Sequence, residues 1–184
     1  MVKKCVECYL ISELAEEARE QAIETVRGDE YFLYKIARED AQDAAAWVLA
    51  ERGFDLEEGP FYDLHRGDFA VRASWHGYKP QDLGGGLTEL ERRAREANVD
   101  IHIWLIPVGD RRTTIEVEVE TPEDREDLRA SFEEEAHALA EEALEEARRA
   151  VAEAWDTVLS DEYVADFAEA NERLFTEKGE ACPL

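Results

Sequence analysis

The feature that most constrains the fold is a long stretch near the C-terminus in which apolar residues recur at helical spacing. Residues 123–159 predict one helix, which would be about 55 Å long at ~1.5 Å per residue. Its inner stripe is approximated by seven positions: Leu128, Phe132, Leu139, Ala143, Val151, Trp155 and Val158. Ser160 is a good N-cap for a final helix that runs to about Phe175. Residues 121–184 are therefore expected to form an acidic helical region.

A two-residue alternation of apolar and polar side chains predicts a β-hairpin just before this region. Residues 100–108 and 111–120 flank Gly109-Asp110, a pair of residues that favours a tight turn. One face of the hairpin is expected to be buried and to hold Ile101, Ile103, Leu105, Ile115, Val117 and Val119. The opposite face would then carry His102, Trp104, Thr114, Glu116 and Glu118.

The first 97 residues predict further strands and helices. A strand is expected at 2–10, and helices at 13–27 and 30–52. A second hairpin is expected from residues 61–64 and 69–75 around His65-Arg66-Gly67-Asp68, followed by a loop at 76–87 and a helix at 88–97. The fold class is α+β, a single domain over 1–184. Residues 1–120 are expected to form a sheet of about five antiparallel strands and two N-terminal helices. Residues 121–184 are expected to form a long acidic helix followed by a short one.

The charge of the chain excludes several functions. Among 184 residues, 46 are Asp or Glu and 21 are Lys or Arg, which gives a formal net charge of −25. Such a field repels nucleic acids and anionic membranes, so we expect no direct binding to either. The sequence has no apolar run of ~20 residues and no signal-peptide pattern, so a cytoplasmic protein is predicted.

The cysteines predict neither a disulfide framework nor a metal site. Cys5, Cys8 and Cys182 are an odd number. Cys5 and Cys8 have the spacing of a metal or redox pair, but in a strand they would point to opposite faces. Because there is no second pair of this kind to complete a zinc site, we expect no metal and no cofactor.

Catalytic motifs are missing, so the chain is not expected to be an enzyme. The four histidines fall in different predicted elements, and no nucleophile or zinc-protease motif accompanies them. His102 with Glu116 and Glu118 is a candidate for binding a divalent cation, but a solvated polar sheet face explains these residues better. The basic residues offer an alternative ligand site, for an anionic nucleotide, at Arg92, Arg95, His102, Trp104, Arg111 and Arg112.

Two stretches carry a family resemblance. ISELAEEAREQAIETVR near the start and SDEYVADFAEANERLFTEKGE at the end resemble a family of small phage and prophage proteins. Members of that family have a SELSEEAKEKAI-like opening helix and an EANEYEFTEDG-like C-terminus. The resemblance is specific over about 35 residues. It implies that the protein comes from a mobile element, and it supplies no site residues.

The acidic helix is the strongest functional feature. Residues 120–184 contain 21 acidic and 6 basic residues. Glu134, Glu141 and Glu145 share one helix face, and Glu135, Glu142 and Glu146 lie on a neighbouring face. These six residues are the predicted partner-binding site, with each carboxylate standing in for a phosphate. The alternative is a solvated face that only keeps the protein in solution.

The function predicted from this surface is inhibition of a host nucleic-acid-handling defence system, of the restriction or CRISPR type. The protein would bind one basic nucleic-acid-binding host protein or complex through a surface that mimics DNA. Sequestering an anionic nucleotide signal, or binding a basic toxin as an antitoxin does, are the alternatives. A second copy of the chain, in a homodimer, is a further candidate partner.

Overall fold

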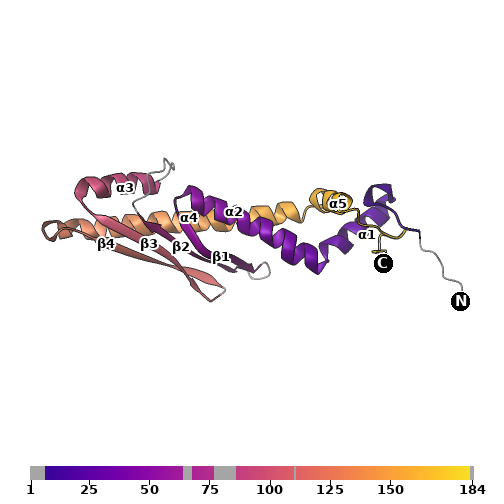
Figure 1. Cartoon of the computed structure of the whole chain (residues 1–184), viewed down its shortest axis with the longest axis horizontal. Helices are drawn as coiled ribbons and strands as arrows, with labels where there is room; N and C mark the ends of the chain where they lie inside the picture. The colour runs from indigo at the N-terminus through magenta and orange to yellow at the C-terminus, as the bar shows by residue number, and fades with distance from the viewer. Residues whose placement is uncertain (1–6, 64–67, 77–85, 110, 183–184) are drawn as a thin grey trace. The chain divides into compact units, whose positions relative to one another are not determined.

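The computed structural model describes residues 7–63, 68–76, 86–109 and 111–182 (Figure 1). It is an α+β structure with one four-stranded antiparallel sheet and a long C-terminal helix. In chain order the elements are η1 (Ile11–Glu13), α1 (Glu16–Arg27), η2 (Phe32–Ala37), α2 (Arg38–Glu51), β1 (Asp55–Asp63), β2 (Asp68–His76), α3 (Gly86–Ala97), β3 (Asp100–Val108), β4 (Arg112–Glu120), η3 (Glu123–Leu128), α4 (Arg129–Val158) and α5 (Asp161–Ala170).

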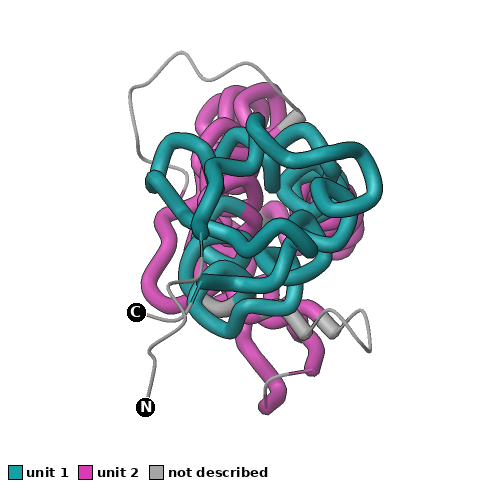
Figure 2. The backbone as a smooth tube through the Cα atoms, turned by 90° about the vertical axis from the view of Figure 1, so that its right-hand side faces the viewer, with its two compact units in different colours: residues 1–40, 153–184 teal, residues 41–152 magenta. Residues whose placement is uncertain are grey.

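The chain divides into two compact units (Figure 2). Unit 1 comprises residues 1–40 and 153–184, and unit 2 comprises residues 41–152. The sheet and α3 belong to unit 2. The expectation of a single domain over the whole chain stays a prediction.

The hairpin of β3 and β4 in unit 2 confirms the predicted register. Ile101 pairs with Val119, Ile103 with Val117 and Leu105 with Ile115. The strand order is β1-β2-β3-β4, so each strand pairs with its neighbours in sequence. Side chains on one face of the sheet form the core of unit 2 together with apolar residues of the helices: Val71, Ala73, Trp75, Ile101, Ile103, Leu105 and Val119 are all at most 5% exposed.

The first hairpin is longer than predicted. β1 begins at Asp55, whereas the sequence pattern placed its start at Phe61. The register shifts twice between Leu56 and Phe61, around Gly59, which has φ +89°. Such irregularities break the two-residue alternation, which is why the pattern hid the first half of the strand. The predicted turn at 65–68 lies almost wholly outside the described residues, but the strands pair up to Asp63 and Asp68, as a hairpin requires.

Both ends of the loop predicted at 76–87 belong to regular elements in the structure. His76 is the last residue of β2, where it pairs with His102 of β3. α3 begins at Gly86, two residues earlier than predicted. Residues 77–85 lie outside the described part of the chain.

The long acidic helix is confirmed from Arg129 onward, where α4 runs for 30 residues. The stretch Glu123–Leu128 is a separate 3₁₀ helix with a non-helical residue at Arg125 (φ −128°), so the predicted single helix is wrong at its start. Most of the predicted stripe is buried, but Leu128 and Leu139 are only half-buried. Small residues complete the buried face of α4: Ala136, Ala140 and Ala147 have no exposed surface.

Unit 1 packs around aromatic and aliphatic side chains of α1, η2 and α5. The rings of Phe32 and Phe167 lie 4.9 Å apart at 58°. Asp29 accepts hydrogen bonds from the N–H groups of Tyr31 and Phe32 and from Arg173 (2.9 Å). Burial opposes ionisation of Asp29, but these hydrogen bonds outweigh it and lower the pKa of the carboxyl group.

The ends of the chain in unit 1 differ from the sequence predictions. α5 stops at Ala170 rather than near Phe175, because Glu172 adopts a left-handed conformation (φ +49°) and the chain leaves the helix there. Residues 2–6 of the strand predicted at 2–10 lie outside the described residues, and Tyr9 forms an isolated antiparallel bridge with Phe175.

Two cysteines form a disulfide that the sequence did not predict. Cys8 is bonded to Cys182 across a sequence separation of 174 residues. Two residues so far apart in sequence meet only through the fold, so their spacing contained no signal for the bond. Cys5, the third cysteine, lies outside the described residues.

We predict that the two faces of β3 differ in how strongly they hold the fold. Ile103 has no exposed surface, so Ile103→Ala should lower the free energy of unfolding by about 2 to 4 kcal/mol through the cavity it leaves. Trp104→Ala should lower the free energy of unfolding by less, because Trp104 is half-buried on the opposite face. Urea denaturation of both variants measures the difference. A loss at Trp104 equal to or greater than that at Ile103 would contradict a smaller contribution of this second face to stability.

Candidate functional site

The six predicted partner-binding carboxylates lie along α4, within unit 2. Glu134, Glu141, Glu142 and Glu145 are exposed, and Glu135 and Glu146 are half-buried. Their spacing places them on two adjacent rows. Row A holds Glu134, Glu141 and Glu145, and row B holds Glu135, Glu142 and Glu146.

Row B pairs with Arg52, the residue that follows α2, and with Arg93 of α3. The Arg52 guanidinium donates to Glu146 (Nε to Oε2, 2.8 Å) and to Glu142 (Nη2 to Oε1, 3.2 Å). Only 23% of the Arg52 side chain is exposed. Burial disfavours its charge, but the hydrogen bonds and charges of Glu146 and Glu142 outweigh this and raise the pKa of Arg52. Glu142 and Glu146 of row B therefore make stabilising contacts within unit 2.

The third member of row B is held by α3. Arg93 donates a hydrogen bond to Glu135, and this bond raises the pKa of the arginine. The same guanidinium lies 5.8 Å from the centre of the Phe132 ring, within range of a cation–π contact. The negative charge of Glu135 is thus compensated by the positive charge of Arg93.

Among the described residues, the partners of row A lie on its own helix. Glu145 accepts from Arg148 (2.9 Å), and Glu141 lies 3.7 Å from Nδ1 of His137. The side chains of Glu141 and Glu145 are 65% and 59% exposed. Exposed pairs of this kind contribute little to stability and are easily exchanged for another cation. Row A is therefore the part of the predicted site that is available to a partner.

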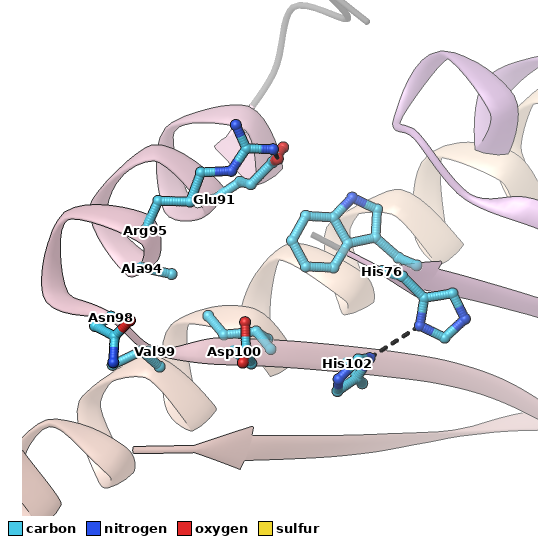
Figure 3. Close-up of a pocket in the computed structure, with 10 residues that line it drawn as sticks. His76, Glu91, Ala94, Arg95, Asn98, Val99, Asp100 and His102 are labelled. Atoms are coloured by element: carbon cyan, nitrogen blue, oxygen red, sulfur yellow. Dashed lines mark hydrogen bonds and ion pairs between the residues drawn. The ribbon is translucent and has the colours of Figure 1, made fainter. Parts of the chain in front are cut away.

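A second candidate site is a pocket between α3 and the ends of β2 and β3. Its volume is about 190 Å³, and its lining includes Trp75, His76, Arg95, Asn98, Val99 and His102. Figure 3 shows Arg95 and Glu91 on the α3 side of this pocket, with His76 and His102 on the strand side. His76 was not predicted as a site residue, because the sequence pattern placed it in a loop, whereas it is the last residue of β2.

Three aromatic rings cluster beside the pocket. Nδ1 of His76 lies 3.0 Å from Nδ1 of His102. The His102 ring stacks on Trp104, with 5.8 Å between ring centres and 22° between planes. The signal that would have found the pair is the continued alternation Arg72, Ser74, His76, which keeps His76 in the strand.

The six residues of the alternative nucleotide site are only partly brought together. Arg95 and His102 line the pocket, and Trp104 stacks on His102. Arg92 instead pairs with Glu89 and Glu96 on the outer side of α3, and these bonds raise its pKa. Arg111 and Arg112 lie at the turn between β3 and β4, where Arg112 pairs with Val108, six positions along β3 from His102.

Comparisons with protein-family models, with curated proteins and with solved structures found no match. Within the described ranges, no helix is long and apolar enough to cross a membrane. The same residues contain no group of three or more His, Cys, Asp or Glu side chains placed to hold a metal ion.

We predict that Arg52→Ala destabilises the protein by about 1 to 2 kcal/mol. The substitution removes two ion pairs and the packing of the arginine stem, and it leaves Glu142 and Glu146 to repel each other. Arg92→Ala is the matched control, because Arg92 pairs only within its own helix among the described contacts and is 56% exposed. Thermal unfolding compares the two. An equal, small shift for both variants would show that row B does not tie α4 to α2.

Proposed function

We propose that the protein is a stoichiometric inhibitor that binds a basic nucleic-acid-binding protein through the exposed carboxylates of α4. The observation that carries this proposal is row A, three exposed carboxylates on one face of a helix whose opposite face is buried. Their spacing along the axis is about 10 Å and then about 6 Å. These distances are of the same order as the spacing of phosphates along a nucleic-acid strand.

The chemistry of such a surface favours one class of partner. A groove that binds nucleic acid is lined with arginine and lysine, and each can donate charge-assisted hydrogen bonds to a carboxylate. The net charge of −25 adds long-range attraction that speeds the encounter. Repulsion among the glutamates of α4 is relieved when a cationic partner binds.

Host defence complexes are the proposed targets. Restriction and CRISPR complexes both have long basic channels for nucleic acid, and the sequence resemblance implies a mobile-element origin. The location of the protein in the host cytoplasm belongs to the same proposal. A basic toxin would present similar chemistry and is the alternative partner.

We predict that the two rows of α4 separate binding from stability. Glu134→Gln, Glu141→Gln and Glu145→Gln combined should weaken binding to the partner by about tenfold or more, because three charge-assisted contacts are lost. The melting temperature should stay equal or rise, since like-charge repulsion is relieved. The row B triple variant at Glu135, Glu142 and Glu146 is the matched control, and it should lower the melting temperature.

The experiment uses a panel of purified restriction and CRISPR effector complexes. The protein is added at increasing molar ratio, and release of bound DNA is followed at several salt concentrations. Displacement that saturates near one protein per complex, weakens with salt and is lost in the row A variant is expected. Displacement by both triple variants equal to that of the unchanged protein would overturn the phosphate-surrogate role of row A.

A second candidate function, sequestration of an anionic nucleotide, is favoured by the pocket that Arg95 and His102 both line. Its weakness is that Glu91 and Asp100 also line that pocket and repel phosphate. We therefore predict no heat in calorimetric titrations with cyclic or linear nucleotides. Micromolar binding that disappears in Arg95→Ala, with Arg92→Ala as the matched control, would place the function at the pocket instead.

A further inference from the structure

The pairing of three strands places two imidazoles and a carboxylate in one row across the sheet. His76 of β2 pairs with His102 of β3, and His102 pairs with Glu118 of β4. Residues directly opposite each other on paired strands lie on the same face, with Cβ atoms about 4.5 to 5.5 Å apart. This row lies on the face opposite Ile103 and Leu105, so it is directed away from the core of unit 2.

The two imidazoles face each other through the same ring atom. Nδ1 of His76 and Nδ1 of His102 are 3.0 Å apart and share a hydrogen bond, as the dashed line in Figure 3 marks. Two imidazole nitrogens that bind one ion at 2.0 to 2.1 Å, with an angle of about 90 to 110° between them, are separated by about 2.8 to 3.4 Å. The observed separation therefore suits a shared metal ion, which would lie beside the line that joins the two nitrogens.

The surroundings of the pair hold it in this geometry. The His102 ring stacks on Trp104, and the ring of His76 meets Trp104 edge-on at 6.2 Å. Packing of this kind orients a ligating imidazole before the metal arrives. His76 is exposed and His102 is half-buried, so an ion can reach the pair from solvent and keep water in its remaining positions.

We infer that His76 and His102 form an open binding site for a divalent transition-metal ion, with Cu²⁺ as the preferred ion. Imidazole nitrogen suits copper, nickel and zinc, and affinity rises toward copper in the first-row series. Two protein ligands are too few for a closed structural zinc site, so the ion is exchangeable. Glu118 contributes negative charge in the same row, and the net charge of the chain raises the local concentration of cations.

The test is titration of the full-length protein with CuCl₂, NiCl₂ and ZnSO₄ in physiological salt and excess Mg²⁺. Magnesium occupies the many carboxylates, because it prefers oxygen ligands. Calorimetry gives stoichiometry and affinity, and the electron paramagnetic resonance spectrum of Cu²⁺ shows whether nitrogen ligates. One Cu²⁺ per chain with nitrogen coupling is expected, with weaker binding of Ni²⁺ and Zn²⁺ and quenching of tryptophan fluorescence.

Single variants locate the site. His76→Asn and His102→Asn should each lower Cu²⁺ affinity about tenfold or more, since loss of a ligand costs at least as much as loss of a second-shell partner. His137→Asn is the matched control, because His137 is an exposed histidine on α4 beside one glutamate. His76 is exposed, so its variant tests the site without disturbing the core. Affinity unchanged in His76→Asn, or lowered equally in His137→Asn, would overturn the inference.

Discussion

The rotation of α4 about its own axis determines which of its carboxylates reach solvent, and its alanines fix that rotation. Ala136, Ala140, Ala143 and Ala147 are completely buried. Alanine adds almost no bulk beyond the backbone, so the rest of unit 2 packs close against this side of the helix. Turning the helix would bring glutamates into that contact without room or compensating charge, at a cost of several kcal/mol per buried ion. The two rows of glutamates follow from this constraint.

The register of the sheet has a similar consequence for the histidines. Trp75 pairs with Ile103, and both side chains are buried in the core. A slip of one residue between β2 and β3 would turn one of these apolar sets toward solvent. Burial of the apolar face therefore fixes the position of His76 opposite His102 on the other face. The metal-binding geometry that we infer therefore depends on core packing, which sets the strand register, as well as on the ring contacts of the histidines with Trp104.

The elements with an uninterrupted local pattern were predictable from the sequence. The alternation in β3 and β4 located the hairpin and its register, and the helical spacing located α4 from Arg129 onward. β1 was only half predicted, because Glu57, Glu58 and Gly59 interrupt its alternation at the register shifts. Pattern alone identifies a strand but does not choose its partner or extend it through such an irregularity.

The contacts that define the candidate sites are long-range, and this is why the sequence did not reveal them. His76 meets His102 only because β2 pairs with β3, although α3 separates these two strands in the sequence. Arg52 meets Glu146, which is 94 residues away in the sequence. The disulfide between Cys8 and Cys182 has the same origin. The six glutamates and their two helix faces were predicted from helical spacing, but the pairing of row B with Arg52 and Arg93 was not, because it depends on where those arginines lie in the fold.

The two proposed interactions respond to charge in physically different ways. Row A binds through ions, so each contact it makes weakens as salt screens the field, and several contacts together weaken steeply. The imidazoles coordinate a metal as neutral ligands, and the bonds themselves are short and directional. The surrounding negative charge raises only the local concentration of the metal ion. This effect of charge is smaller than its effect on the direct ionic contacts of row A. The same acidic chain can therefore combine a salt-sensitive protein interface with a metal site whose affinity depends mainly on the geometry of two paired strands.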